Sequence, residues 1–247
     1  MLRLNSQPST SILTALVKIL NKFKQLITPK DKFKLVKFNN LKLVSGKRFY
    51  EKKFQIAIVK ILKKSNFFID VGSCRGMYVL LAQHHMAANS KIYGFEPNLV
   101  YQKELSKLNI EKNIYYKNYN VALSDKIGKK SLYKNSFLRR MNRKGKTVKT
   151  ISLDKFLSKN IKKIPNIVKI DVEGWEFKVL KGCKKLIKNK KTHFFVEIHD
   201  KYLKSINKST KDVLKLFNKK FYYHKKIDFK KAINTNLIYY HFKPKKI

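Results

Sequence analysis

The chain has 247 residues, of which 43% are hydrophobic and 13% aromatic, and its formal net charge is +43. This length allows one globular domain with a modest appendage but not two ordinary domains, and the apolar content argues against disorder despite the charge. The two cysteines, Cys74 and Cys183, lie far apart without partners at metal-ligand spacing. The sequence therefore suggests neither a disulfide framework nor a zinc site, and we expect a reducing, cytoplasmic location.

The positive charge has two competing explanations. A surface of this charge attracts anions such as nucleic acid, acidic lipid headgroups or anionic glycans. Of the 58 basic residues, however, only six are arginine, and Asn, Ile and Tyr are abundant, as an AT-rich coding sequence would give. A protein built to bind phosphate would use more arginine for bidentate contacts. The charge alone does not decide between these explanations.

Residues 1–49 are expected to form a basic amphipathic helical extension, and residues 50–247 the main domain. Within the extension, apolar residues from Leu13 to Ile27 recur at helical spacing, with lysines on other faces. Lys18 interrupts any signal-peptide core, and no stretch approaches the roughly 20 apolar residues of a spanning helix. We expect residues 11–28 either to pack on the main domain or to make peripheral contact with a membrane or a partner.

From about residue 50, short apolar runs alternate with amphipathic stretches. This alternation predicts repeated strand–helix units and a mostly parallel sheet. Two aromatic runs, 221–223 and 237–242, are expected to pair as a terminal antiparallel hairpin. The other strands are expected at 67–71, 91–95, 114–123, 167–172 and 194–198, with short extended pieces at 131–133 and 147–151, and the helices at 77–88, 97–108, 152–157, 174–187 and 210–217.

The first predicted strand ends in Asp70 and enters a turn that contains Gly72 and Gly76. Such a turn lets a cofactor approach the backbone at the carboxyl edge of the sheet. Glu96 ends the next strand, where an acid can accept hydrogen bonds from ribose hydroxyls. Cys74 stands where a dinucleotide fingerprint has its middle glycine, so a cofactor without a pyrophosphate is favoured, such as S-adenosylmethionine.

A second group of acids follows the apolar run 167–170. A hydroxyl that attacks a methyl donor must lose its proton, so a carboxylate or imidazole near the methyl group serves as a base. Asp171 is the first candidate, the alternative being that it only helps to hold the cofactor. Glu173 comes next, and Glu197 and His199 end the neighbouring strand, where His199 could act as base or contact the substrate. A divalent cation could bridge these groups, but no tight ligand spacing is visible, so no metal site is predicted.

Two charged residues near these acids are expected to be structural. Glu176 lies in the first turn of the next predicted helix, where the helix dipole favours an acid. Lys169 lies inside the buried run, where we expect it to pair with a carboxylate, or else to position the acceptor.

Six short motifs occur in order over about residues 66–200. They are residues 70–76, 95–98, 121–125 with Gly128, 152–154, 169–176 with 179–182, and 196–199. Together they resemble the FkbM family of methyltransferases. The resemblance implies an α/β, doubly wound, mostly parallel seven-stranded sheet of the Rossmann-like class I methyltransferase type. It also implies S-adenosylmethionine as methyl donor and O-methylation of a sugar, glycan or related hydroxylated metabolite.

The same resemblance assigns cofactor contacts along the carboxyl edge of the sheet. They are Asp70, Gly72 and Gly76 at the methionine end, Glu96 at the ribose, and Ala122, Ser124 and Asp125 near the adenine. The pair Cys74-Arg75 departs from the family, which usually has small or polar residues there. Arg75 would therefore shape the entrance of the site or weaken binding.

Two other functions stay open from the sequence. The basic surface would suit an RNA ribose 2'-O-methyltransferase, since phosphate contacts dominate nucleic-acid affinity, but no RNA-binding module is recognisable. A non-catalytic binding protein on the same fold is the other, although the retained acids argue against it. The segment 129–149, which contains Arg139, Arg140 and Arg143, is expected either to face an anionic or lipid-linked acceptor or to be a solvated loop.

Overall fold

The computed structural model describes residues 34–38, 41–45, 51–111, 113–131, 147–161, 163–227 and 237–246. In these residues no helix has the length and apolar character that crossing a membrane requires. The expected helix over residues 11–28 lies outside the described residues, and so do the three arginines of the basic segment, Arg139, Arg140 and Arg143.

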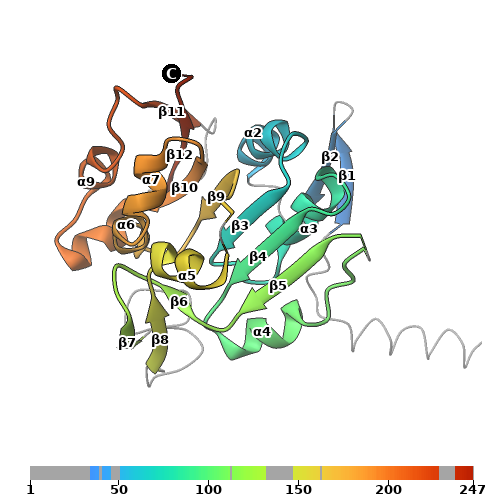
Figure 1. The fold of residues 1–247 in the computed structure, drawn as a ribbon, viewed down its shortest axis with the longest axis horizontal. Helices are drawn as coiled ribbons and strands as arrows, with labels where there is room; N and C mark the ends of the chain where they lie inside the picture. The colour runs from blue at the N-terminus through green and yellow to red at the C-terminus, as the bar shows by residue number, and fades with distance from the viewer. Residues whose placement is uncertain are drawn as a thin grey trace, which may run out of the picture.

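A seven-stranded sheet forms the centre of the molecule (Figure 1). Its strands are β3 (Phe67–Val71), β4 (Lys91–Phe95), β5 (Tyr115–Tyr119), β9 (Ile167–Ile170), β10 (His193–His199), β11 (Tyr222–Ile227) and β12 (Leu237–Pro244). Their order across the sheet is β11-β12-β10-β9-β3-β4-β5. Only the pairings of β12 are antiparallel, on one side with β10 and on the other with β11. The predicted fold class is confirmed, and the expected C-terminal antiparallel pair is present.

Helices cover both faces of this sheet. They are α2 (Lys52–Leu62), α3 (Met77–His85), α4 (Leu99–Leu105), α5 (Leu153–Asn160), α6 (Glu176–Lys181), α7 (Lys184–Asn189), α8 (Asp200–Leu203) and α9 (Thr210–Lys215), with a 3₁₀ turn at Lys204–Ile206. Phe67, Ile69 and Val71 of β3 belong to a core cluster shared with α5, α6, α7 and α9. Phe68 belongs to a second cluster, shared with α2 and α3. The alternation of side chains along β3 thus produces two apolar layers, one on each side of the sheet.

Several expected boundaries differ from those observed. The helix expected from Pro97 begins at Leu99, because Asn98 is the cap and its side chain accepts a hydrogen bond from Val100 N–H at 2.9 Å. The single helix expected over 174–187 is two helices, α6 and α7, with Gly182 between them. A Cβ on Gly182 would lie 2.0 Å from the carbonyl oxygen of Ser124, so the chain turns where another segment packs closely against it.

Two small sheets lie beside the large one. The first joins β6 (Ala122–Leu123), β8 (Thr147–Ile151) and β7 (Gly128–Ser131), so the strand expected over 114–123 is divided between two sheets. The second is the antiparallel pair β1 (Lys34–Phe38) and β2 (Leu41–Ser45). Its residues were expected to belong to a helical extension, and they form strands instead.

The pair β1–β2 is attached to the main domain. Leu43 and Val44 are buried in the cluster that α2 and α3 share. The side chain of Gln55 in α2 also accepts a hydrogen bond from the Val44 N–H at 2.9 Å and donates one to the Val44 carbonyl at 2.7 Å. Since this buried amide satisfies both backbone groups of Val44, the strand is fixed to the helix.

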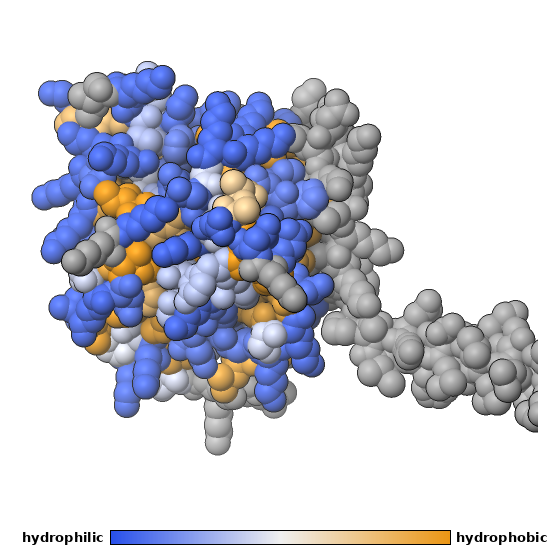
Figure 2. Space-filling model, turned by 45° about the vertical axis from the view of Figure 1, so that its right-hand side comes forward, coloured by the Kyte–Doolittle hydropathy of each residue, from blue (hydrophilic) through white to orange (hydrophobic). Residues whose placement is uncertain are grey.

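Hydrophilic side chains cover most of the face drawn in Figure 2, with smaller apolar areas between them. A hydrophilic surface is expected for a chain in which 30% of the residues are charged.

Candidate active site

The turn after β3 is closed by contact with two neighbouring strands. Gly72 has a φ of +80°, and a Cβ on it would lie 1.8 Å from the carbonyl oxygen of Asp171. Its N–H donates a hydrogen bond to the carbonyl of Phe95 at 2.9 Å. The backbone of the turn therefore lies directly between the ends of β4 and β9, where only glycine fits.

A Gly72→Ala substitution is expected to destabilise the protein by about 1–3 kcal/mol, because the backbone of Asp171 must move away. Thermal unfolding of the two chains measures this loss. Gly128→Ala is the matched control, since a Cβ there meets nothing closer than Thr150 Oγ1 at 3.7 Å. Equal melting temperatures for both variants would show that the turn is not as closely packed as described.

Glu96 connects this turn to the start of α4. Its Oε2 accepts a hydrogen bond from the Cys74 N–H at 3.0 Å, and its Oε1 accepts one from the Asn98 N–H at 2.8 Å. Burial raises the pKa of Glu96 to about 7, even though both hydrogen bonds favour the carboxylate. Gly76, with a φ of +86°, lies between the turn and α3 as the cap of that helix. Glu96 is thus a carboxylate held rigidly at the end of β4.

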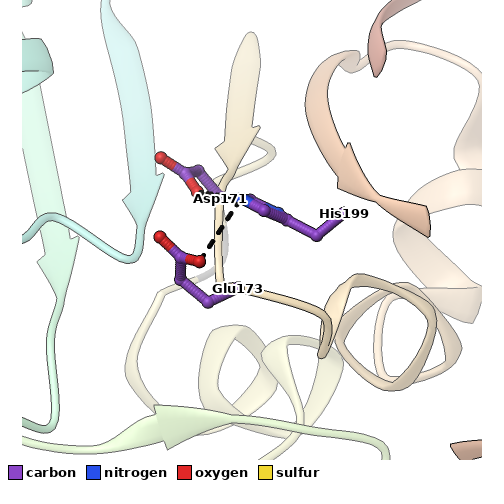
Figure 3. Close-up of side chains that lie close together, drawn as sticks. All are labelled: Asp171, Glu173 and His199. Carbon is purple, nitrogen blue, oxygen red and sulfur yellow. Dashed lines mark ion pairs between the residues drawn. The ribbon is translucent and has the colours of Figure 1, made fainter. Parts of the chain in front are cut away.

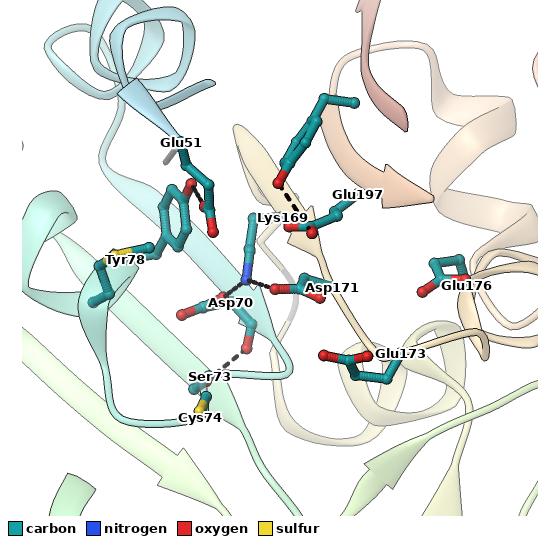
Figure 4. Close-up of polar contacts among 12 residues, drawn as sticks. Glu51, Asp70, Ser73, Cys74, Tyr78, Lys169, Asp171, Glu173, Glu176 and Glu197 are labelled. Carbon is teal, nitrogen blue, oxygen red and sulfur yellow. Dashed lines mark hydrogen bonds and ion pairs between the residues drawn. The ribbon is translucent and has the colours of Figure 1, made fainter. Parts of the chain in front are cut away.

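A buried lysine lies between two acids from adjacent strands (Figure 4). Asp70 of β3 pairs in register with Lys169 of β9, and Lys169 Nζ lies 3.5 Å from Asp70 Oδ1 and 3.3 Å from Asp171 Oδ2. Burial opposes the charge of Lys169, but these carboxylates raise its pKa above the ordinary value. Lys169 was expected to pair with one carboxylate, and it pairs with two. Asp70 Oδ2 is buried and accepts no hydrogen bond from the described residues.

Two acid–tyrosine pairs extend this group. The half-buried Glu51 accepts a hydrogen bond from the Tyr78 hydroxyl, and Glu197 Oε1 accepts one from the Tyr239 hydroxyl at 3.1 Å. Burial raises the pKa of Glu197 well above its usual range. No motif or spacing in the sequence connects Glu51, Tyr78 and Tyr239, so none of them was predicted to belong to the site.

His199, at the end of β10, brings the second group of acids together. Its Nδ1 lies 2.9 Å from Glu176 Oε1, while its Nε2 lies 3.5 Å from Glu173 Oε2 and 3.9 Å from Asp171 Oδ1 (Figure 3). Burial opposes protonation of the imidazole, but the hydrogen bond to Glu176 and the charges of the acids raise the pKa of His199 to about 10. The structure therefore brings together the three residues predicted to be catalytic, Asp171, Glu173 and His199.

Glu176 does more than complement a helix dipole. It occupies the first turn of α6 as expected, but its side chain is fully buried and accepts hydrogen bonds from the Gly174 N–H at 2.8 Å and from His199. A buried carboxylate on Nδ1 fixes the orientation of the ring and directs Nε2 towards Asp171 and Glu173. Spacing along the sequence does not show this role, because Glu176 lies in α6 and its partner His199 lies at the end of β10.

The residues assigned to the adenine lie where β6 meets α6. Ser124 Oγ accepts a hydrogen bond from Trp175 Nε1 at 3.2 Å and donates one to Asp125 Oδ1 at 3.1 Å. Asp125 also pairs with Lys178 at 3.1 Å, and Ala122 begins β6. Arg75, the departure from the family pattern, lies against α4, with its Nε 3.4 Å from Glu104 Oε2. These polar contacts organise the edge, and a role at the adenine stays a prediction.

The geometry of the site indicates a class of enzyme. A left-handed glycine turn after the central strand, a buried acid at the end of the next strand and a cluster of acids beside them are typical of Rossmann-like enzymes that bind a nucleoside cofactor. Gly72 is only partly buried and Cys74 is exposed, so a cofactor can approach the turn, and Glu96 and Asp70 Oδ2 supply buried acceptors. The residues present therefore fit such a cofactor.

Comparison with known families identifies the class more closely. Residues 70–224, more than half of the chain, match the model of the methyltransferase FkbM domain. The chain therefore belongs to the FkbM methyltransferase family, and its cofactor is S-adenosylmethionine. No curated protein matches the sequence significantly.

Solved structures share the fold at low sequence identity. An rRNA methylase from Streptococcus thermophilus has a TM-score of 0.52 and 10% identity, over 82% of this chain and 100% of that one. A fibrillarin pre-rRNA processing protein from Methanococcus jannaschii has a TM-score of 0.52 and 12% identity, over 86% and 83%. Methyltransferase FkbM from Methylobacillus flagellatus has a TM-score of 0.47 and 14% identity, over 71% of this chain and 43% of that one. The first two similarities establish the fold and nothing about substrate.

Proposed function

We propose that this methyltransferase transfers a methyl group to a hydroxyl oxygen of a sugar, glycan or related metabolite. The observation that carries the proposal is the convergence of Asp171, Glu173 and His199 beside the glycine turn. S-adenosylmethionine supplies an activated methyl group on a sulfonium sulfur. A hydroxyl acceptor gives up its proton as its oxygen takes the methyl group, and this cluster offers carboxylates to receive that proton.

Asp171 is the proposed base, with Glu173 and His199 holding the acceptor. Its Oδ2 lies 3.3 Å from Lys169 Nζ, and its side chain remains 25% exposed, so an acceptor can reach it. We also propose the cofactor contacts that the family resemblance implies. They are Asp70, Gly72 and Gly76 for the methionine end, Glu96 for the ribose, and Ala122, Ser124 and Asp125 for the adenine.

Cofactor affinity is expected to depend on pH through Glu96. The ionised carboxylate of Glu96 would accept hydrogen bonds from the ribose hydroxyls. Burial raises the pKa of Glu96 to about 7. Protonation below that pKa removes acceptor capacity, so the Kd for S-adenosylmethionine should rise by up to about tenfold for each pH unit below 7 and level off above it. Calorimetric titrations at several pH values measure the curve. A Glu96→Gln chain should bind weakly with no such curve, and an identical curve in that variant would remove Glu96 from the ribose site.

A transfer assay tests the hydroxyl acceptor. Purified chain is incubated with methyl-labelled S-adenosylmethionine and, separately, neutral sugars, anionic or lipid-linked glycans, and RNA. Label in an alkali-stable ether on a sugar or glycan is the expected result. Transfer to RNA alone would instead support a ribose 2'-O-methyltransferase, the alternative that the charge of +43 favours. Cofactor binding without transfer to any acceptor would favour a non-catalytic binding protein.

A further inference from the structure

The acidic residues of this basic chain are concentrated at one place. The whole sequence has 15 Asp and Glu residues against 58 Lys and Arg, yet six of the acids surround Lys169 and His199. The six are Glu51, Asp70, Asp171, Glu173, Glu176 and Glu197. Lys169 and His199 are the basic side chains that these acids contact. Carboxylates in excess at a largely buried site are costly unless protons or further cations balance them.

Three of these side chains are arranged as ligands. One atom each from Asp171, Glu173 and His199 lie within 4.8 Å of one another (Figure 3). His199 Nε2 is 3.5 Å from Glu173 Oε2 and 3.9 Å from Asp171 Oδ1. Two ligand atoms on one metal ion lie roughly 3–3.5 Å apart when each bond is about 2.1 Å. Because the Glu173 side chain is 41% exposed, a small rotation suffices to close the set around an ion.

The imidazole is already oriented for this role. Buried Glu176 holds Nδ1 at 2.9 Å, and its own carboxylate is fixed by the Gly174 N–H. A carboxylate on one ring nitrogen of a histidine, with the other nitrogen facing acids, is the usual support of a metal-binding histidine.

Glu197 gives independent support for a missing partner at the same point. It is only 4% exposed, its Oε1 lies 3.7 Å from His199 Nε2, and its Oε2 is buried without a hydrogen-bond partner among the described residues. In Figure 4 its carboxylate points towards Asp171. A buried carboxylate beside the cluster, with one oxygen that has no hydrogen-bond partner among the described residues, is a position where a cation would be stabilised.

We propose that Asp171, Glu173 and His199 bind one divalent cation, with Glu197 as a fourth side chain within reach and Glu176 orienting His199. One imidazole with several carboxylates suits Mn²⁺, Fe²⁺ or Zn²⁺ better than Ca²⁺. The inference rests on the proposed function, because the cation would bind the acceptor oxygen and make its hydroxyl more acidic. The proton would still leave to Asp171, through the carboxylate oxygen that the cation does not hold. The sequence predicted no metal site, because these ligands come from the ends of two different strands.

Titration of the full chain with Mn²⁺ alone tests the site. The protein is prepared without a histidine tag, and moderate salt in the buffer screens the basic surface. Electron paramagnetic resonance measures the concentration of free Mn²⁺. We expect one Mn²⁺ per chain. Glu173→Gln and His199→Gln should each weaken binding by at least about tenfold. Glu111→Gln, which changes an exposed acid away from the cluster, should bind like the wild type.

Three outcomes decide the inference. Loss of binding in the two cluster variants, with Glu111→Gln unchanged, supports it. Absence of stoichiometric binding to the wild type, or equal binding by wild type and Glu173→Gln, overturns it. Because the Glu173 side chain is 41% exposed, we expect Glu173→Gln to fold like the wild type. Circular dichroism checks this. Calorimetry with S-adenosylmethionine on the same samples separates the two claims, since cofactor binding without Mn²⁺ binding removes the cation and leaves the proposed function intact.

Discussion

Replacing Asp171 by asparagine is expected to lower kcat roughly 10²- to 10⁴-fold with any hydroxyl acceptor that the wild type methylates. Asparagine has the same shape but cannot take a proton from the acceptor. Since Gly72 contacts the backbone rather than the side chain of Asp171, the turn that we propose as the cofactor site should be unaffected. The Kd for S-adenosylmethionine should therefore change by no more than a few-fold. Single-turnover transfer of labelled methyl, beside a calorimetric titration, measures both quantities.

The control for this variant is Glu111→Gln, which removes a carboxylate from the exposed surface. It should have wild-type kcat and cofactor affinity. If Asp171→Asn retained kcat within a few-fold of the wild type, Asp171 would not be the base, and Glu173 would become the first candidate. If both transfer and cofactor binding were lost together, Asp171 would serve the cofactor rather than the acceptor.

Lys169→Met is expected to destabilise the fold by about 3–5 kcal/mol, the cost of leaving a buried charge without its partner. Lys169 is 2% exposed and Asp70 is fully buried, so water cannot replace the lost ion pair. For a chain of this size the melting temperature should fall by on the order of 10 °C. Thermal and denaturant unfolding measure the change.

The double variant Lys169→Met, Asp70→Asn distinguishes charge from packing. If the unpaired carboxylate causes the loss, neutralising Asp70 should restore a substantial part of the stability, and the two substitutions will not be additive. Additive losses would show instead that Lys169 acts mainly through its contact with the Tyr78 ring, which lies 4.6 Å below the ammonium group.

The sequence predicted the large sheet well, and there is a physical reason for this. Strands buried on both faces are short apolar runs, so those at 67–71 and 91–95 have the bounds that were expected. The pair β1–β2 was missed because its register depends on contacts with α2, among them the hydrogen bonds of Gln55. The break between α6 and α7 was missed because the close approach of Ser124 to Gly182 is a tertiary contact without local signature.

The candidate site was only partly visible in the sequence. Asp171, Glu173 and His199 could be grouped, because the carboxyl ends of neighbouring parallel strands meet at one edge. The role of Glu176 could not be inferred, since its position at a helix start already had a sufficient explanation. Glu51 comes from outside the sheet, and only the folded chain brings it to Tyr78.

Calorimetric titration of the full chain with S-adenosylmethionine, at moderate and at high salt, tests the central claim most directly. Wild-type chain should bind one cofactor in the micromolar range at both salt concentrations, because the site is partly buried and little screened. Glu96→Ala should bind roughly 10- to 100-fold more weakly, as expected when hydrogen bonds to a charged group are lost. Absence of saturable binding at either salt, or equal binding by the wild type and Glu96→Ala, would contradict the account.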